Sequence, residues 1–301
     1  MNGKMVSNIR FGGTGLPYVD FEKAKAVIIS APYEGTVTYK KGTKNGPAAI
    51  LEASAKLEFF DDELNVETYK IGIHTLPPLN IANLPVDEAV EEVYKSEKEV
   101  LKAGKLPVLI GGEHSVTIGA VKAVKEAAGD VSVLQLDAHY DLRDNWEGVK
   151  NNHACVARRI QEIAPLVQLG VRSLSKEEKD FLSGQNNITK SISAYDMLTD
   201  LLWDRKVIEA LKDKVYITID LDVFDPSLMP AVGTPEPGGL SWYVVLDILR
   251  TVAQQKEIVG FDVVELSPLE GNIASDFTAS KLIYRLLGYI FFEKGKGDKK
   301  R

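Results

Sequence analysis

The stretch Leu134–Asp144, LQLDAHYDLRD, carries three ligand-type side chains at every second position after an apolar run. Side chains of a β-strand alternate between its two faces, so Asp137, His139 and Asp141 would begin on one side of the chain. Carboxylates and an imidazole crowded together repel and desolvate one another unless a cation lies between them. The spacing therefore predicts a metal site at the end of this strand.

Further candidate residues also end or follow apolar runs, and they are Glu113, His114, Asp220, Asp222, Asp225 and Glu265. In open parallel sheets, ligands bind outside the carboxyl ends of the strands. We therefore expect separate segments of the chain to deliver these side chains to one edge of a sheet.

Each isolated residue also has a purely structural interpretation. Asp220 and Asp222 could form a turn, and His114 could cap a helix. The glycines at 111–112 could serve only a tight turn, although they would also let backbone approach an ion. His74 has no acidic neighbour in the sequence and is interpreted as structural. The D-x-H-x-D run resists such an explanation, because three of the four histidines of the chain lie in the candidate segments.

The candidate ligand set comprises two imidazoles and four carboxylates, with no thiolate. Such a set favours harder ions such as Mn²⁺ or Mg²⁺ over structural zinc. Four carboxylates exceed the need of one divalent ion, but they suit two ions about 3.5–4 Å apart with bridging carboxylates. Such a pair lowers the pKa of a bound water from about 15.7 toward about 7, which supplies hydroxide at neutral pH.

Strand and helix patterns alternate along the chain. Strands are predicted at 25–30, 106–111, 131–137, 166–171, 215–222 and 257–266, with a weaker one at 188–193. Helices are predicted at 47–60, 86–103, 116–127, 152–163, 242–255 and 274–292. Near-continuous apolar strands between helices indicate a parallel sheet covered on both faces. Because no linker or repeat divides the chain, we expect one α/β domain over residues 1–301; a split into two domains is the alternative.

Composition limits the partners of the chain. Its 301 residues carry a net charge of −7, which argues against a nucleic-acid surface and leaves a cationic ligand open. The single cysteine, Cys155, excludes an internal disulfide and indicates a reducing compartment. With no leader and no apolar stretch that would span a membrane, a cytoplasmic protein is expected. Residues 1–20 are expected to form an N-terminal arm, and residues 293–301 a flexible tail.

The segments that carry these residues resemble the ureohydrolases, the arginase–agmatinase family of dinuclear manganese enzymes. GTKNGPAAI, GGEHS, DAHYD, NNHACVARRI, DLDVFDP, GTPEPGGLS and DVVELSP occur in the family's order and span Gly42–Pro268. The chain is most similar to the agmatinase branch, including archaeal-type members with DLRD after the metal motif. The resemblance implies a single three-layer α/β/α domain around a mainly parallel eight-stranded sheet, and a homo-oligomer, either a trimer or a hexamer.

The resemblance also implies two Mn²⁺ ions per chain. The ligands that it implies are His114, Asp137, His139, Asp141, Asp220 and Asp222. Asp137 and Asp220 would bridge the ions, with His114 and Asp141 completing one ligand set.

Three residues carry the hydrolysis that the resemblance implies. His153 matches the family's active-site histidine, a proton shuttle, and Glu265 matches the carboxylate that holds the guanidinium. Asp141 would pass a proton to the departing amine. A helix-start histidine bonded to backbone, and a Glu265 that is solvated or paired with Lys281, are the structural alternatives. Glu113 stands where Asp is commoner, and NNHAC stands where many agmatinases have Ser-His-Gly, which alters the wall beside His153.

Agmatine is the substrate that the resemblance favours, with putrescine and urea as products. N1-aminopropylagmatine, a precursor of spermidine, fits nearly as well, and arginine, guanidinobutyrate and formiminoglutamate rank below. The loop after the metal motif offers Asp144 and Glu147 to an amine tail, but also Arg143 and Lys150. From other classes, a zinc-dependent deacetylase-like amidohydrolase would hold one metal with fewer carboxylates, and a silent regulatory homologue would have lost ligands.

Overall fold

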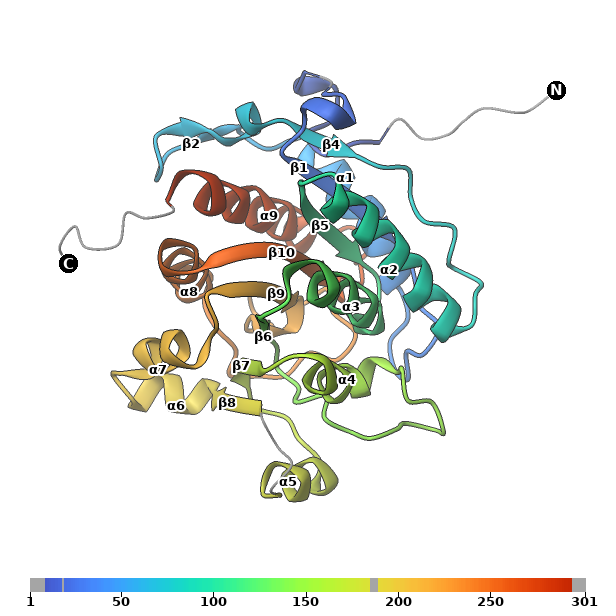
Figure 1. The fold of residues 1–301 in the computed structure, drawn as a ribbon, viewed down its shortest axis with the longest axis vertical. Coiled ribbons are helices and arrows are strands. Elements are labelled where there is room, and N and C mark those ends of the chain that lie inside the picture. Colours follow the sequence, from blue (N-terminus) through green and yellow to red (C-terminus); the bar gives the residue numbers. More distant parts are fainter. Residues whose placement is uncertain (1–8, 18, 185–188, 294–301) are drawn as a thin grey trace.

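The computed structural model describes residues 9–17, 19–184 and 189–293, and an eight-stranded sheet lies at its centre between helices (Figure 1). The strand order is β4-β1-β5-β10-β9-β6-β7-β8, and every neighbouring pair is parallel. The predicted three-layer α/β/α fold with a mainly parallel eight-stranded sheet is therefore confirmed.

The strands of the main sheet are β1 (Ala26–Ala31), β4 (Ile73–Thr75), β5 (Leu106–Gly111), β6 (Val131–Leu136), β7 (Leu166–Val171), β8 (Thr189–Ser193), β9 (Lys214–Asp220) and β10 (Glu257–Val264). The strands β2 (Phe60–Asp61) and β3 (Val66–Glu67) form a separate antiparallel pair. The α-helices are α1 (Gly46–Ser54), α2 (Val86–Lys102), α3 (Thr117–Ala128), α4 (Val156–Ile163), α5 (Lys176–Leu182), α6 (Ala194–Thr199), α7 (Trp203–Ala210), α8 (Trp242–Gln255) and α9 (Ala274–Phe292). The seven predicted strands are all present, whereas β4, the β2–β3 pair and the short helices α5, α6 and α7 were not predicted.

The helix predicted over 47–60 is wrong in its second half. Helix α1 ends at Ser54, whose hydroxyl donates to the Leu51 carbonyl at 2.6 Å and accepts the Gly12 amide at 2.9 Å. These bonds occupy the end of the helix, and the chain then turns toward β2. Phe60, predicted as helical, is therefore a strand residue.

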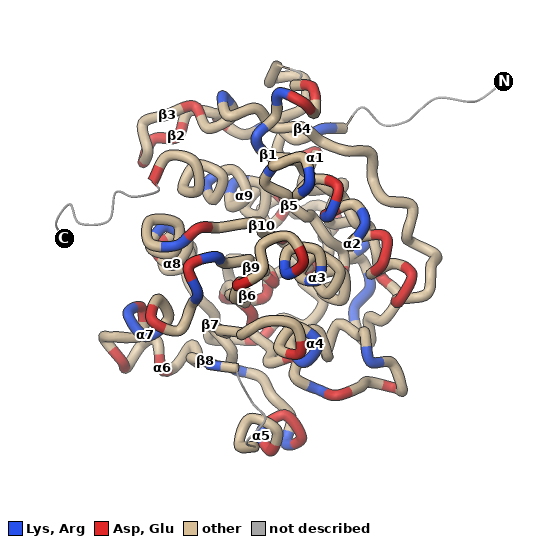
Figure 2. The backbone as a smooth tube through the Cα atoms, in the orientation of Figure 1, with Lys and Arg blue, Asp and Glu red and all other residues tan. Residues whose placement is uncertain are grey.

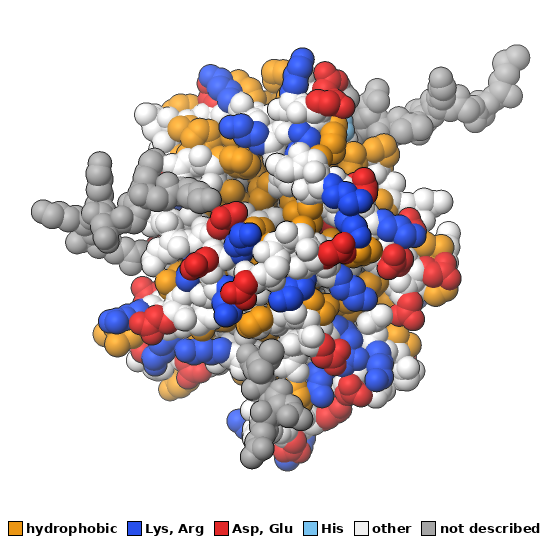
Figure 3. Space-filling model, viewed as in Figure 1, with side chains coloured by type: hydrophobic (Ala, Val, Ile, Leu, Met, Phe, Trp, Pro, Cys, Tyr) orange, Lys and Arg blue, Asp and Glu red, His pale blue; other side chains and the backbone are white. Residues whose placement is uncertain are grey.

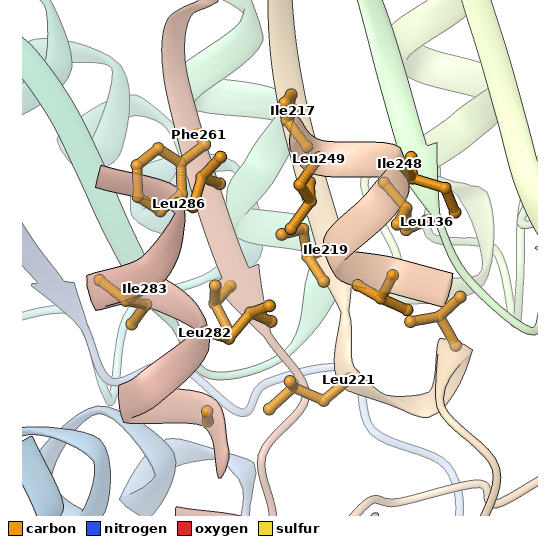
Figure 4. Packing of buried hydrophobic residues seen from close by; sticks show 14 of the residues in the cluster. Leu136, Ile217, Ile219, Leu221, Ile248, Leu249, Phe261, Leu282, Ile283 and Leu286 are labelled. Atoms are coloured by element: carbon orange, nitrogen blue, oxygen red, sulfur yellow. The ribbon is translucent and has the colours of Figure 1, made fainter. Parts of the chain in front are cut away.

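Helices cover both faces of the sheet. The helices α1, α8 and α9 pack on one face, and α2, α3 and α4 pack on the other (Figure 1). Figure 4 shows Ile283 and Leu286 of α9 beside Phe261 of β10, and Leu249 of α8 beside Ile217 of β9. Full burial of one such side chain is worth about 1.5–3 kcal/mol. This two-sided core explains the continuous apolar strands and holds the strand ends in fixed positions.

The strands that carry the candidate residues are neighbours. Strands β5, β10, β9 and β6 lie consecutively in the middle of the sheet. Because all four are parallel, their carboxyl ends lie at one edge. Residues far apart in the sequence therefore meet there.

The described surface mixes both signs of charge. Figure 2 shows Lys and Arg interspersed with Asp and Glu along the helices, and the face in Figure 3 also carries scattered hydrophobic side chains. No described helix combines the length and the hydropathy that crossing a membrane would require. The predicted cluster of aspartates at the sheet edge is therefore not part of a broadly acidic surface on the face shown.

The predicted N-terminal arm and C-terminal tail fall partly on residues 1–8 and 294–301, which lie outside the described residues. The described part of the arm packs against the main sheet, since the Phe11 amide donates to the Thr75 hydroxyl at 3.1 Å.

Candidate active site

The structure brings the predicted ligands together at the carboxyl ends of β5, β6 and β9. His114 follows β5, Asp137 directly follows β6, and Asp220 ends β9. The Nδ1 atom of His114 lies 3.2 Å from Asp137 Oδ2, 3.3 Å from Asp220 Oδ2 and 3.6 Å from Asp141 Oδ2. Three carboxylates therefore converge on one imidazole nitrogen.

Buried hydrogen bonds determine the tautomer of His114. The hydroxyls of Tyr216 and Thr218 donate to the Asp262 carboxylate at 2.8 and 2.6 Å. Since Thr218 uses its proton there, it accepts the Nε2–H of His114 at 2.9 Å. Nδ1 of the neutral ring then carries a lone pair, and this buried atom has no hydrogen-bond partner within the described chain. Burial lowers the pKa of His114, but the three carboxylates outweigh it and, without a metal, raise that pKa well above its usual value. A lone pair facing three carboxylates is repulsive without a cation, so the site fits a metal ion.

Two groups of closely spaced ligand atoms share Asp137, and the first comprises atoms of His114, Asp137 and Asp141. The ligand atoms of Asp137, His139 and Asp222 lie within 4.8 Å of one another. His139 Nδ1 lies 2.8 Å from Asp222 Oδ2 and 3.8 Å from Asp137 Oδ1. Because Asp137 belongs to both groups, it is placed to bridge two metal ions. Asp220, the other expected bridge, contacts His114 but belongs to neither of these groups.

Like charges crowd the site. Burial, reinforced by the charges of Asp222 and Asp137, raises the pKa of Asp220 well above its usual value. Burial and the Asp137 charge raise the pKa of Asp141 to about 7. Burial lowers the pKa of His139, but the neighbouring carboxylates outweigh it and raise that pKa to about 11. The site thus has a strong affinity for positive charge, which metal ions would supply in place of protons.

Two candidate residues adopt a strained backbone. Asp141 has φ 51° and Glu265 has φ 68°, values that L-residues rarely adopt. The Glu265 amide donates to the Gly112 carbonyl at 2.8 Å, and its Oε1 accepts the His114 amide at 2.6 Å. Gly112 has a packing role, because a Cβ there would lie 2.0 Å from the Tyr33 carbonyl oxygen. These contacts hold Glu265 beside the end of β5, where its carboxylate accepts a backbone amide instead of pairing with Lys281.

Five of the six predicted ligands, all except Asp137, line a cavity of about 90 Å³. Its lining residues are Val37, Thr38, Tyr39, Lys40, His114, His139, Asp141, His153, Ala154, Asp220, Asp222, Gly233, Thr234 and Glu265. Burial, followed by the charge of Glu113, raises the pKa of Glu265 to about 8. A cation in the cavity would favour the ionised form of this carboxylate.

His153 also lines this cavity. It begins a short 3-10 helix, His153–Cys155, and its Nδ1 lies 3.0 Å from the Thr36 hydroxyl. Burial, reinforced by the charges of His114 and His139, lowers the pKa of His153 to about 4. The structural alternative, a histidine bonded only to nearby backbone, does not describe this contact.

His74 and Cys155, which the sequence also singled out, lie outside the cavity lining. His74 is within β4, where its Nδ1 lies 2.9 Å from the Val19 carbonyl oxygen and its ring packs edge-on against Phe21. Cys155 is buried, and burial raises the pKa of its thiol to about 12. Both positions agree with the structural roles expected for these side chains.

Segments 37–40 and 233–234 line the cavity but were not predicted as site residues. The first segment contains no ligand-type residue that could have indicated a site. The second begins the GTPEPGGLS motif, and this motif could have indicated that the segment lies at the site. The acidic loop residues expected near an amine tail lie elsewhere. Asp144 pairs with Arg159 at 3.0 Å, and neither Asp144 nor Glu147 lines the cavity.

Fold and site together define a class of α/β proteins whose central parallel strands deliver histidine and aspartate ligands to one sheet edge. Within this class, the chain belongs to the Arginase family, whose family model matches residues 24–288. The N(1)-aminopropylagmatine ureohydrolase of Synechocystis sp. is 40% identical over 277 residues, which cover 89% of this chain and 90% of that protein. The Agmatinase of Pyrococcus horikoshii is 36% identical, with 91% of this chain and 94% of that protein covered.

A solved structure agrees with these relatives. The agmatine ureohydrolase of Thermoplasma volcanium superposes with a TM-score of 0.82 and 32% identity, covering 90% of this chain and 91% of that chain. The chain is therefore a ureohydrolase, a hydrolase that acts on guanidino compounds, and the predicted family and reaction class are confirmed.

Proposed function

We propose that the chain releases urea from a cationic guanidino substrate built on agmatine, with two Mn²⁺ ions bound. The observation that carries this proposal is the buried, unpartnered Nδ1 of His114 among three carboxylates, in a cavity that Glu265 also lines. A cation site and a carboxylate for a guanidinium thus share one small cavity.

The proposed metal ligands are His114, Asp137, His139, Asp141, Asp220 and Asp222. Their carboxylates and imidazoles, without a thiolate, support Mn²⁺ over a thiolate-favouring ion. When bound, the ions supply a water acidic enough to act as a nucleophile near pH 7. Asp137, which belongs to both groups of ligand atoms, is the better supported of the two bridges.

Glu265 would bind the guanidinium. A guanidinium remains a planar cation near neutrality, since its pKa exceeds about 12. A carboxylate can accept two parallel N–H bonds from it, which fixes both position and orientation. The bond from the His114 amide to Oε1, at 2.6 Å, supports a fixed position for this carboxylate. Orientation of the guanidinium carbon toward the metal side of the cavity would then lower the barrier to attack.

Asp141 and His153 would handle the protons. Both side chains line the cavity together with His114, His139, Asp220 and Asp222. Asp141 would pass a proton to the departing amine, and His153 would exchange protons between the cavity and solvent.

N1-aminopropylagmatine is the preferred substrate in this proposal, because four relatives that are 37–40% identical bear the name of its ureohydrolase. Agmatine, the substrate favoured at first, is next, and it is supported by the Pyrococcus and Thermoplasma proteins. The two molecules share the guanidino end and differ only in an added cationic arm.

The test is urea release from protein loaded with Mn²⁺, with N1-aminopropylagmatine, agmatine, arginine, guanidinobutyrate and formiminoglutamate assayed side by side. The highest kcat/KM is expected for N1-aminopropylagmatine. Metal analysis on the same preparation should give two ions per chain. A preparation that binds two ions yet releases urea from neither amine-tailed substrate would overturn the proposal.

We further expect a homo-oligomer, either a trimer or a hexamer. Leu198, Leu201 and Leu202 are 81%, 92% and 58% exposed, which supports burial of this surface against another subunit. Light scattering on the purified protein tests the subunit number. The cytoplasmic location stays a prediction.

A further inference from the structure

The Thr36 hydroxyl lies between the carboxyl of Glu113 and the ring of His153. Its Oγ1 is 2.7 Å from Glu113 Oε1 and 3.0 Å from His153 Nδ1. The backbone amide of His153 donates to the same oxygen at 3.1 Å. One hydroxyl thus connects a fully buried carboxylate to the histidine that lines the cavity.

The protons of this group can be assigned by counting donors and acceptors. A backbone amide can only donate, so the His153 N–H occupies one lone pair of Thr36 Oγ1. The hydroxyl keeps one proton and one lone pair, to be divided between Glu113 and the His153 ring. Which way the proton points decides which ring nitrogen of His153 carries hydrogen.

The surroundings of Glu113 determine which way the proton of the Thr36 hydroxyl points. The Thr36 amide donates to its Oε2 at 2.7 Å, the Ser115 hydroxyl donates to its Oε1 at 2.6 Å, and the Gly35 amide also hydrogen-bonds to this carboxyl. With these donors directed at it, the carboxyl is an acceptor, whereas the ring nitrogen of His153 can either donate or accept. The Thr36 hydroxyl therefore donates to Glu113 and accepts the Nδ1–H of His153.

We propose that Thr36 and Glu113 are positioning residues that hold His153 in its Nδ1–H tautomer. Nε2 is then the nitrogen that presents a lone pair to the cavity and can accept a proton there. When Nε2 is protonated, Nδ1–H still donates to Thr36, whose hydroxyl connects the imidazolium to the Glu113 carboxyl. This inference rests on the proton-transfer role proposed for His153.

Substitution of Thr36 tests the inference. Thr36→Val keeps the shape of the side chain but removes the acceptor for both His153 N–H groups, whereas Thr36→Ser keeps the hydroxyl. Loss of a partner that orients a histidine costs about 10–100-fold in comparable sites. We expect kcat of T36V to fall by about 10-fold or more, with KM changed by less than about 3-fold and two Mn²⁺ still bound. T36S should recover most of this loss.

A double-mutant cycle separates positioning from general damage. If Thr36 acts through His153, then T36V should have little further effect on kcat in the H153N background, because the ring to be oriented is already absent. Glu113→Gln, which replaces an acceptor oxygen by a donor, should behave in the same way and serves as a second variant if T36V is unstable. An equal loss of kcat in both backgrounds would overturn the inference, as would a T36V enzyme with wild-type kcat. By contrast, an H153N enzyme with wild-type turnover would overturn the role of His153 itself.

Discussion

Asp220 serves the fold and the site with different oxygen atoms. Its Oδ1 accepts the Asp222 amide at 2.9 Å and caps the turn after β9, while its Oδ2 lies 3.3 Å from His114 Nδ1. Of the two interpretations of the D-x-D pattern, the turn is observed for Asp220, and its second oxygen lies where the proposed metal ligands converge. A side chain with such a double role calls for a substitution that removes only one of them.

Asp220→Asn is that substitution, because an amide oxygen can still cap the turn but the charge is lost. We expect D220N to lose at least one Mn²⁺ per chain and most of its activity while its fold is retained. Asp225→Asn is the matched control: Asp225 accepts the Ser227 amide and the amides of residues 238 and 239, and it has no atom in the cavity lining. Metal content and turnover would be measured on both; a D220N protein with two ions and near-normal turnover would refute its role as a ligand.

Glu265 offers a second prediction at this scale. Glu265→Gln preserves the shape and an acceptor for the His114 amide, but it cannot match a guanidinium in charge. Losing a charge-assisted pair costs about 2–5 kcal/mol, so kcat/KM should fall at least about thirtyfold. Both metals should remain bound. Normal kinetics in a fully loaded E265Q preparation would show that this carboxylate does not hold the substrate.

Residue types predicted which histidines and aspartates cluster at the sheet edge better than they predicted the residues that contact this cluster. Asp137, His139 and Asp141 follow one strand at alternate positions, which a sequence displays directly. Thr36 contacts His153 from 117 residues away, and nothing in its type or spacing indicates a site. Such partners depend on which loops the sheet order brings together, and that order is not contained in any one segment.

At the scale of elements, long periodic segments were predicted well and short ones were missed. Helices α8 and α9 match their predicted bounds, because α8 presents a sustained apolar stripe to the sheet and α9 is a long apolar segment buried on most of its sides. Helices α5 and α6 are short and depend on capping boxes, Ser175 with Glu178 and Ser193 with Asp196. Strand β4 is only three residues long, so its pairing with β1 in the folded sheet, and not its own sequence pattern, makes it a strand.

Helix α2 carries a buried charge-bearing group that affects stability. Both carboxyl oxygens of Glu97 are buried without a hydrogen-bond partner in the described structure. Burial, followed by the charge of Asp262, raises the pKa of Glu97 well above its ordinary value of 4.5. A raised pKa means that the folded state binds this proton more tightly than the unfolded state does. The free energy of unfolding should therefore fall as pH rises above about 4.5, toward the folded-state pKa.

Glu97→Gln removes this proton-linked term. The stability of E97Q relative to the parent chain should increase with pH, by at most about 1.4 kcal/mol per pH unit within the titration window. Denaturant unfolding of both proteins at pH 5 and pH 8 measures the difference. An identical pH dependence for the two proteins would show that Glu97 does not titrate between the folded and unfolded states.

At the scale of the whole molecule, the site joins strands that are far apart in the chain. The ends of β5, β6 and β9 meet around His114, Asp137 and Asp220, where like charges oppose one another. The core on both faces of the sheet must hold these groups together in the absence of ions. Metal ions would reverse this repulsion and connect the three strand ends, so binding should stabilise the fold.

Metal removal tests this coupling directly. A ligand that binds only the folded state at 100 times its Kd adds about 2.7 kcal/mol per site, so Mn²⁺ should raise the Tm by several degrees over chelator-treated protein. H153N should show the same increase, because His153 is proposed to be no ligand, whereas D220N should lose part of it. Thermal unfolding of the three proteins, with and without Mn²⁺, would be measured at one protein concentration. An unchanged Tm for the parent chain with two ions bound would mean that the strand ends are held equally well without metal, and that the metal centre serves the chemistry alone.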